Sequence, residues 1–428
     1  MPPNVSTVYD RYGKTYNLSR ILNAQDRLDP IKYQAYSPPY ISAGYYLYLC
    51  VSFTAYTFAF VYVFLNEWKI FQEAIKGLWK GLRDRKSSAY ARYRDPLSIL
   101  MRNYEEVPDW WFLILLVISV VVGCVIVHVY PTGTPVWAAI VAILVGIAML
   151  VPCIVLYSNT GYFLSLNNLG TILAGYMVPG SGVACLILRA YGYAVEDQAE
   201  TFISDQKLAH YAKLPPRAVF RAQLIATIIS IFVTSGALEL AHGLPDFCSL
   251  DQGSRFYCAW SHSIYSGTLL FGAVGPHRTF DLLYPMIKWA FLIGGVAAVP
   301  IYFVRQRFAK QLRFFHPALV LGGFMRYGTG YNLSYYTPGF YASVAFMWYI
   351  RTRYLAWWSK YNYIISCGLT AGIAFSGILI FLALQYRPKT LVWWGNTVAT
   401  SGVDGINKAT LKPLPNVGYF GVANNTWV

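Results

Sequence analysis

The chain has 428 residues, of which 56% are hydrophobic and 12% are charged. Because soluble domains carry about 25% charged residues, this composition excludes a single soluble core. The formal net charge is +15. The Lys and Arg residues lie in short polar segments between long apolar runs, so they indicate membrane topology and contacts with lipid headgroups, and not nucleic-acid binding.

Apolar runs of membrane-spanning length follow one another along the chain. Each is long enough for the roughly 20 residues that a helix needs to cross a bilayer. The pattern predicts an all-α polytopic membrane protein with about 7 to 9 transmembrane helices plus re-entrant or broken hairpins. The uninterrupted runs are 40–65, 110–130, 135–157, 222–241 and 363–385, and the shorter or broken ones are 169–188, 257–274, 284–304 and 317–350.

The same runs set the expected domain order. A polar N-terminal segment, residues 1–39, precedes a helical membrane domain, residues 40–385, and a polar C-terminal tail, residues 386–428, follows. Within the membrane domain, residues 165–185 and 257–274 contain Gly and Ser in apolar surroundings. We expect these two stretches to form broken or re-entrant hairpins, which transporters use to build substrate and ion sites.

The distribution of Lys and Arg predicts how the spans are oriented. Nine Lys and Arg residues lie between residues 66 and 109, which assigns this segment to the cytosol, and the basic stretch Lys213–Arg217 is expected on the same side. The segment that carries Cys248 and Cys258 then lies outside. An oxidising compartment favours a disulfide between these two cysteines, with two unpaired thiols as the alternative.

Two groups of side chains are candidates for transport chemistry. Glu239 is the only carboxylate in the run 222–241, and His242 lies three residues later on the same helix face. This pair would relay a proton, or would only solvate the end of the helix at the outer interface. His262, Tyr265 and Lys288 are candidates for the substrate pathway. The alternatives are that the segment with His262 and Tyr265 is only a tightly packed hairpin, and that Lys288 only extends its charged end to the headgroups.

Sequence motifs for other chemistries are missing. The six His residues are scattered without HExxH spacing, and no GxxxxGK[ST] loop occurs. We therefore expect no metal, no cofactor and no enzymatic activity, and an ion gradient remains as the energy source for transport.

Several segments resemble the oligopeptide transporter family. The stretch "SDQKLAHYAKLPPR", Ser204–Arg217, is similar to its K-I-P-P-R signature, with Leu214 in place of Ile. The segments "NYEEVPDWW" from Asn103, "FYCAWSHSIYSGTLLFGAVGP" from Phe256 and "YIRTRYLAWWSKYNYIIS" from Tyr349 also match, in the family's order. The resemblance is to the fungal and plant peptide-transport branch more than to the metal–chelate branch.

The motif itself has two interpretations. Pro215 and Pro216 lack N–H donors and fix φ, so they end one segment and set the direction of the next, while Lys213 and Arg217 hold the corner at the interface. The corner is either a rigid anchored turn or a gate hinge at the cytosolic mouth, in which Leu214 would take part.

The resemblance implies proton-coupled symport of small oligopeptides through a lipid bilayer, at the plasma membrane or at an endomembrane. Metal-chelate or glutathione-type peptide transport on the same scaffold is one alternative, and a transport-silent membrane subunit is another. Family members are longer, and their N-P-G signature is not found here. We therefore expect a C-terminal half from an N-terminally truncated transporter, with a missing N-terminal half or a homo-oligomer as partner.

Overall fold

The computed structural model describes residues 5–83, 90, 93–243, 259–313, 315–325, 333–386, 391–397, 413–423 and 426–427. The chain divides into two compact units. The larger unit consists of Ser6–Ile41, Tyr46–Gly322 and Leu414–Val428, and the smaller one of Met1–Val5, Ser42–Tyr45 and Gly323–Pro413. The sites below all belong to the larger unit.

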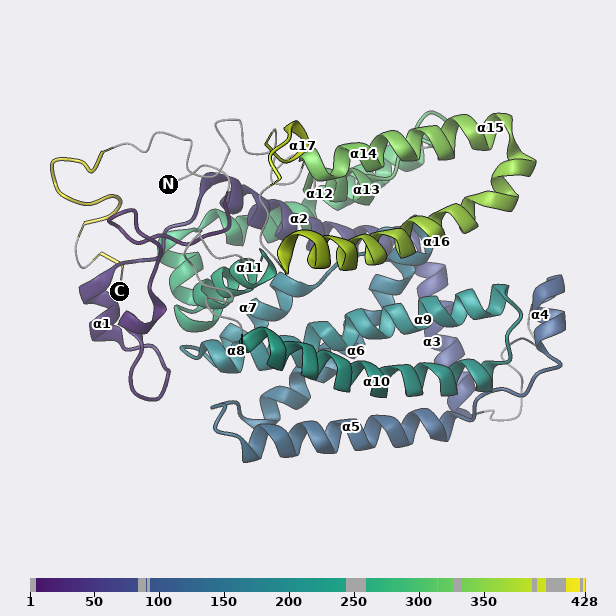
Figure 1. The fold of residues 1–428 in the computed structure, drawn as a ribbon, viewed down its shortest axis with the longest axis horizontal. Coiled ribbons are helices and arrows are strands. Elements are labelled where there is room, and N and C mark those ends of the chain that lie inside the picture. The colour runs from purple at the N-terminus through teal and green to yellow at the C-terminus, as the bar shows by residue number, and fades with distance from the viewer. Residues whose placement is uncertain are drawn as a thin grey trace. The chain divides into compact units, whose positions relative to one another are not determined.

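Helices make up the regular structure of the described residues, with only isolated β-bridges besides (Figure 1). Six of these helices are long and apolar enough to cross a membrane, so the prediction of an all-α polytopic membrane protein is confirmed. They are α2 (Ala43–Asn66), α5 (Asp109–Val129), α6 (Val136–Thr160), α10 (Pro216–His242), α12 (Met286–Arg307) and α16 (Leu355–Ile380), the last extended by the π-helical η8 (Phe381–Gln385).

Local sequence sets where these helices begin and end. α5 and α6 each start directly after a proline, Pro108 and Pro135, whose fixed φ suits a helix start. α6 ends at Gly161, which adopts φ 67° in the left-handed region that favours glycine. The bilayer-length helices therefore carry ordinary stop and start signals at their polar ends.

Of the runs expected to be broken, residues 284–304 instead form the bilayer-length helix α12, because Pro300 lies inside the helix without ending it. The other broken runs form shorter helices. Residues 165–185 give α7 (Asn167–Met177) and the start of α8 (Gly182–Arg189), and the chain continues through the π-helical η3 (Ala190–Ala194) into α9 (Val195–Tyr211). Residues 257–274 give α11 (Ala259–Gly267) and the π-helical η4 (Thr268–Ala273). The remaining elements are η1 (Leu18–Ile21), α1 (Pro30–Tyr36), α3 (Trp68–Arg83), α4 (Pro96–Met101), η5 (Arg278–Leu283), α13 (Pro317–Gly323), α14 (Leu333–Ser343), η7 (Val344–Ile350), α15 (Arg351–Arg353) and α17 (Trp394–Thr397).

The turn between α7 and α8 reaches the same end of the larger unit as the α5–α6 turn. A cavity of about 600 Å³ shows this, because Gly133 and Thr134 of one turn line it together with Val178 and Pro179 of the other. The α7–α8 pair is therefore a broken hairpin that extends to this end and does not turn back at mid-depth.

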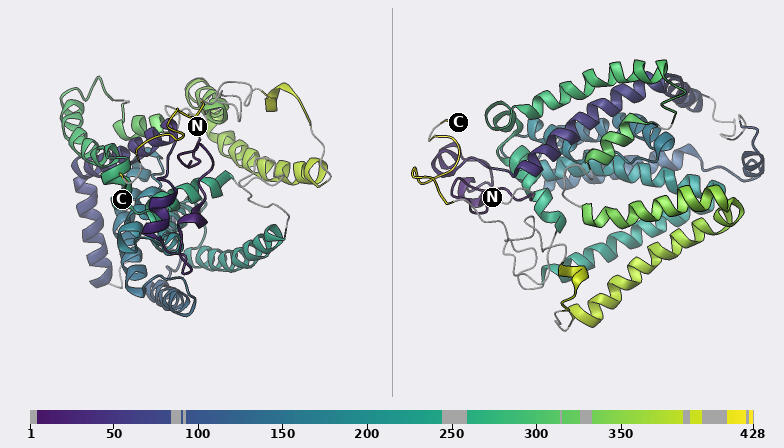
Figure 2. Two further views of the ribbon diagram at one scale, coloured as in Figure 1. Left: turned by 90° about the vertical axis from the view of Figure 1, so that its left-hand side faces the viewer. Right: turned by 90° about the horizontal axis from the view of Figure 1, so that it is seen from above.

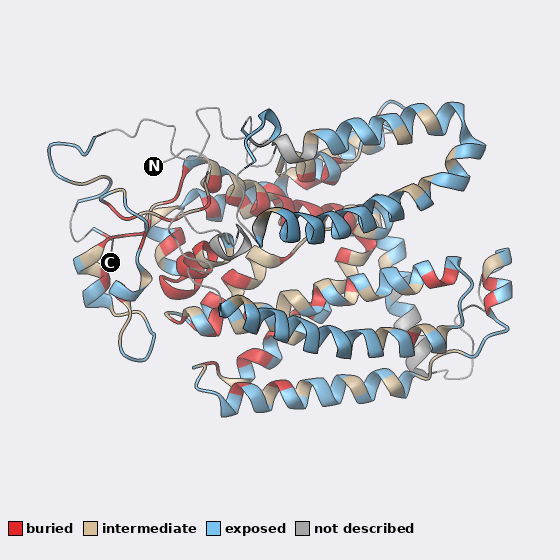
Figure 3. Cartoon of the chain, in the orientation of Figure 1, coloured by how far each residue is buried: buried red, intermediate tan, exposed pale blue. Residues whose placement is uncertain are grey.

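Burial concentrates where the broken helices meet α2. In Figure 3 the buried residues gather there, while α5 and α10 are largely exposed. Phe53 of α2 stacks on Phe291 of α12 with ring centroids 4.8 Å apart, and it also contacts Phe271 and Phe280 edge-on. Every residue of η4 is buried.

The polar ends of the chain pack together in the larger unit. Tyr16, Ile21 and Tyr33 of the N-terminal segment are fully buried. The Arg11 guanidinium lies over the rings of Tyr419 and Trp427, at 3.8 and 4.8 Å from their centroids. Cation–π contacts of this kind join two segments that are about as far apart in sequence as the chain allows. Figure 2 shows the yellow C-terminal segment beside the purple N-terminal segment of the larger unit.

A glycine contact generates a first prediction. A Cβ at Gly175 of α7 would overlap the carbonyl oxygen of Phe271 in η4. Gly175→Ala should lower the free energy of unfolding by about 1–3 kcal/mol, as overpacking does in a filled core. Thermal unfolding in detergent measures this loss.

Gly236→Ala is the matched control, because no described residue lies within 4 Å of a Cβ at Gly236 on α10. Alanine is favoured over glycine inside a helix by about 1 kcal/mol, so this variant should be unchanged or slightly more stable. Equal melting temperatures for the two variants would contradict the close packing of α7 on η4.

Candidate functional site

Two buried carboxylates face α6 from α9. Glu196 and Glu200 are 1% and 3% exposed and lie one helical turn apart. The Cys153 thiol of α6 is a polar group that faces Glu196. Neither carboxylate has an ion pair or a well-formed hydrogen bond to a described residue.

A backbone contact between glycines positions this pair. The Gly192 carbonyl oxygen of η3 lies so close to Gly146 of α6 that a Cβ there would clash with it. Because the helix continues from η3 directly into α9, this contact brings the first two turns of α9 against α6. Glu196 and Glu200 occupy those turns, so the glycine pair determines their burial.

The environment decides the protonation of the pair. Ionised carboxylates that are buried without donors or cations carry a large desolvation cost, and two of them one turn apart also repel each other. Burial therefore raises the pKa of both carboxyls to about 7, which favours protonation of the pair. Exposure to water would remove that constraint, which is the property that a proton-carrying site requires.

The sequence analysis did not identify Glu196 and Glu200. They lie in the polar stretch "VEDQAETFISDQ", Val195–Gln206, which has the composition of a solvated segment. One sequence signal could have indicated the pair. The two glutamates are four residues apart, so they share one face of a helix that continues from an apolar helix.

Glu239 and His242 lie together on the last turn of α10, and both are exposed. The 18-residue membrane window of α10 has no buried residue in the described structure. Their predicted role in proton coupling stays a prediction.

The corner at Lys213–Arg217 has a well-defined geometry. Lys213 adopts φ 59°, and the N–H groups of Lys213 and Leu214 donate to the carbonyl oxygens of His210 and Ala209, at 3.2 and 3.0 Å. This is the Schellman ending of a helix. Pro215 then caps α10 and Pro216 occupies its first turn. The corner joins α9 to α10 without a flexible loop.

Two segments that resemble the family meet at this corner. The Arg217 side chain donates from Nε to the Glu106 carbonyl oxygen at 2.9 Å and forms an ion pair with the Glu105 carboxylate. Phe220 lies 5.5 Å from Trp111 and 4.9 Å from Phe112, measured between ring centroids. The start of α5 and the start of α10 are therefore held at the same end of the larger unit.

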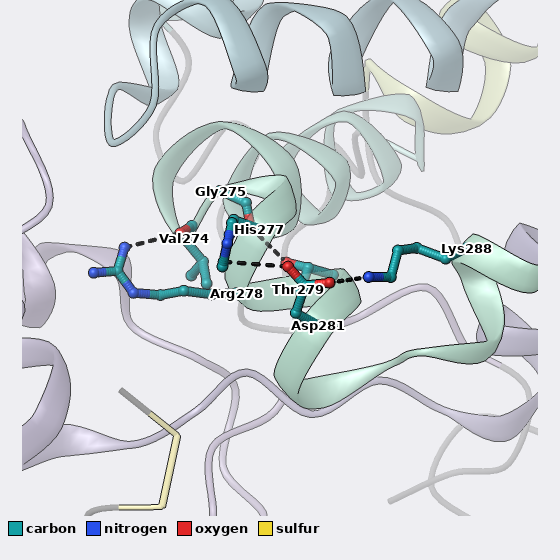
Figure 4. A network of polar contacts seen from close by, with 7 residues as sticks. All are labelled: Val274, Gly275, His277, Arg278, Thr279, Asp281 and Lys288. Carbon is teal, nitrogen blue, oxygen red and sulfur yellow. Dashed lines mark hydrogen bonds and ion pairs between the residues drawn. The ribbon is translucent and has the colours of Figure 1, made fainter.

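Lys288 takes part in a polar cluster before α12. Figure 4 shows Asp281 between Lys288, which donates to it, and His277, whose Nδ1 lies 3.3 Å from the carboxylate. The hydrogen bond from Lys288 lowers the pKa of the Asp281 carboxyl. Thr279 fixes the turn by donating to the Leu270 carbonyl oxygen at 2.7 Å. Lys288 is thus engaged by Asp281 in this conformation.

The other predicted residues are placed as follows. The Tyr265 hydroxyl accepts from the Leu18 N–H at 3.3 Å, so it binds the N-terminal segment to α11. His262 belongs to α11, and its side chain lies outside the part of the chain that the structure describes. Cys248 and Cys258 also lie outside the described residues, so the disulfide stays a prediction.

The corner at Pro215 generates a second prediction. A non-glycine residue in the left-handed region costs roughly 1–2 kcal/mol, so Lys213→Gly should raise the free energy of unfolding by about 1 kcal/mol. Lys207→Gly removes the same charge from the interior of α9 and should lower it by about 1 kcal/mol. Thermal unfolding of both variants provides the comparison. If Lys213→Gly lost as much stability as Lys207→Gly, the corner would not depend on the left-handed conformation of residue 213.

Comparisons with known proteins agree with the motifs. A family model described as "OPT oligopeptide transporter protein" matches residues 1–384. Oligopeptide transporter 2 of Saccharomyces cerevisiae is 38% identical, over 99% of this chain and 50% of that protein. Glutathione transporter 1 of Schizosaccharomyces pombe is 34% identical, over 98% and 48%. Oligopeptide transporter 1 of Arabidopsis thaliana is 33% identical, over 92% and 53%.

The chain spans about half the length of these curated relatives. No solved structure matches it. The match over residues 1–384 includes all six candidate spans, the broken helices and the corner at Pro215. Together with the resemblance of four separate segments, it shows that this chain belongs to the oligopeptide transporter family.

Proposed function

We propose that this chain is a membrane-embedded part of a transporter for small peptides, and that protons drive the transport through Glu196 and Glu200. The single observation that carries the proton-coupled part is the burial of two carboxylates, one helical turn apart and without a described ion pair, between α9 and α6. The names of the relatives support a peptide as the substrate.

The pair couples protons to movement through its change of environment. While buried against α6, it is stable only in a protonated form, because the charged form is poorly solvated there. A conformation that admits water to α9 allows the proton to leave. The pair would then bind a proton on one side of the membrane and release it on the other side as the transporter alternates between its two conformations. Ionisable residues in membrane helices commonly act in this way.

Glu239 and His242 supply the competing proton relay. Both are exposed at the end of α10, so neither carries a burial cost in the described structure. Glu239→Gln therefore serves as a matched control for substitutions in the buried pair.

A glutathione-type substrate is the second candidate. It is favoured by the 34% identity to the protein named Glutathione transporter 1. Competition between a labelled small peptide and glutathione for uptake distinguishes the two substrates. For the location of this integral multi-pass protein, we propose the plasma membrane.

The third prediction tests the proton carrier. Glu196→Gln keeps the size of the side chain and removes its titration, so cells that express this variant should equilibrate a labelled small peptide without accumulating it against its gradient. Glu200→Gln should show the same loss in part, and Glu239→Gln should accumulate peptide like the wild type. Uptake is measured with an imposed pH gradient at equal expression.

Stability provides a second readout. Because a glutamine is the neutral counterpart of a protonated glutamate, Glu196→Gln should unfold at the same temperature as the wild type or higher. Full accumulation by Glu196→Gln would remove the pair from the proposal, and loss of accumulation in Glu239→Gln alone would assign the proton to α10. A wild-type chain that accumulates nothing would support the transport-silent subunit.

A further inference from the structure

The helix α3 is joined rigidly to the end of α2 and runs across the long helices. The Glu67 N–H donates to the Val63 carbonyl oxygen at 2.8 Å, and the Phe71 N–H donates to the Glu67 carbonyl oxygen at 3.0 Å. Backbone hydrogen bonds therefore continue through the bend. Figures 1 and 2 show α3 running across the direction of α5 and α10.

The sequence of α3 gives the helix two different faces. Trp68, Phe71 and Ile75 are three or four residues apart and share one side. Lys69 and Lys76 lie on the other side, seven residues apart. The sequence continues the apolar positions at Leu78, Trp79 and Leu82, and the cationic positions at Lys80 and Arg83.

The described part of the apolar face is only partly covered by the other described residues. Trp68 is 42% exposed and Ile75 is 39% exposed. Trp68 contacts Phe64 at the end of α2, with ring centroids 4.5 Å apart. Large apolar side chains on an exposed helix face indicate an interaction surface.

The position of α3 indicates which surface it meets. The segment that follows it leads to Glu105 and Glu106, which Arg217 binds at the corner before α10. In Figure 1, α3 lies toward the end of the larger unit where α2 ends and α5 and α10 begin. A helix that lies across the ends of membrane spans has the orientation of a helix in the bilayer interface.

We propose that α3 is an interfacial anchor, whose apolar face enters the acyl region of the bilayer while its cations bind anionic lipid headgroups. The charges favour this partner, because α3 has four cationic residues and only one acidic residue, Glu73. Basic amphipathic helices bind anionic membrane surfaces in this way. The proposal is independent of what the protein transports.

The anchor fixes the depth of α2. Phe58 and Tyr62 of α2 form a buried cluster with Ala298 of α12. Because α3 is hydrogen-bonded to α2 without a loop, binding of α3 to the headgroups holds this end of α2 at a fixed level. Anionic lipid would therefore stabilise the core of the larger unit as well as α3.

Hydrogen exchange of the backbone amides in residues 68–83 tests the anchor. The whole chain is placed in nanodiscs of phosphatidylcholine alone, or of phosphatidylcholine mixed with phosphatidylserine. The amides of α3 should exchange more slowly in the anionic discs. Each cation near an anionic surface contributes about 1 kcal/mol, so Lys69→Gln with Lys76→Gln should reduce that protection by roughly 30-fold.

A matched control removes two cations elsewhere. Lys207→Gln with Lys310→Gln changes two exposed lysines outside α3, and it should leave the protection of residues 68–83 unchanged. Ile75→Glu keeps every cation but should abolish protection, because the apolar face can no longer enter the acyl region.

Three results would overturn the proposal. The first is equal protection of α3 in the two lipid mixtures, and the second is an equal loss in the control and in the α3 variant. The third is protection that appears only when a basic-helix-binding protein such as calmodulin is added, since this would assign the surface to a protein partner.

Discussion

The backbone groups of the broken helices must find partners inside the protein, because lipid provides none. The structure meets this constraint by packing the two breaks against each other and against the N-terminal segment. The Gly180 N–H donates to the Gly272 carbonyl oxygen at 3.1 Å, and the Gly180 carbonyl oxygen accepts from the Leu28 N–H at 2.8 Å. The glycines permit this approach, because a Cβ at Gly272 would overlap the Cys185 side chain. The folded polar ends of the chain therefore help to stabilise the core of the membrane domain.

The same kind of close approach creates the candidate proton site. Gly146 and Gly192 allow α6 and the start of α9 to touch through their backbones. Their contact buries Glu196 and Glu200 in a region where water would otherwise solvate them. Such a site is costly to the fold, since the unpaired carboxylates destabilise the packed state unless they hold protons. Proteins retain costly groups of this type where function requires a change of charge.

The end of the larger unit near Pro215 is organised by polar contacts. Arg217 joins the starts of α5 and α10, and the α3 helix extends from the end of α2 toward the same end. Rigid connections replace flexible loops at both places, through a Schellman ending before Pro215 and a continuous hydrogen-bonded bend at Glu67. Movements of α9 relative to α6 would therefore be transmitted to α10 through the corner.

The amino-acid sequence alone determined the fold class, the approximate limits of the long spans and the family. Long apolar runs and prolines at helix starts are local properties of the sequence. In a bilayer they determine which segments form spanning helices. The family resemblance could also be seen from local segments such as "KLPPR".

The sequence could not show that Glu105 and Arg217 meet, because the contact joins positions 112 residues apart. It also could not distinguish Glu196 from Glu239, since both are glutamates on helices. Only the tertiary structure decided that Glu196 is buried against α6 and that Glu239 is exposed, because the burial depends on a contact between two distant glycines and not on the residues next to the glutamate.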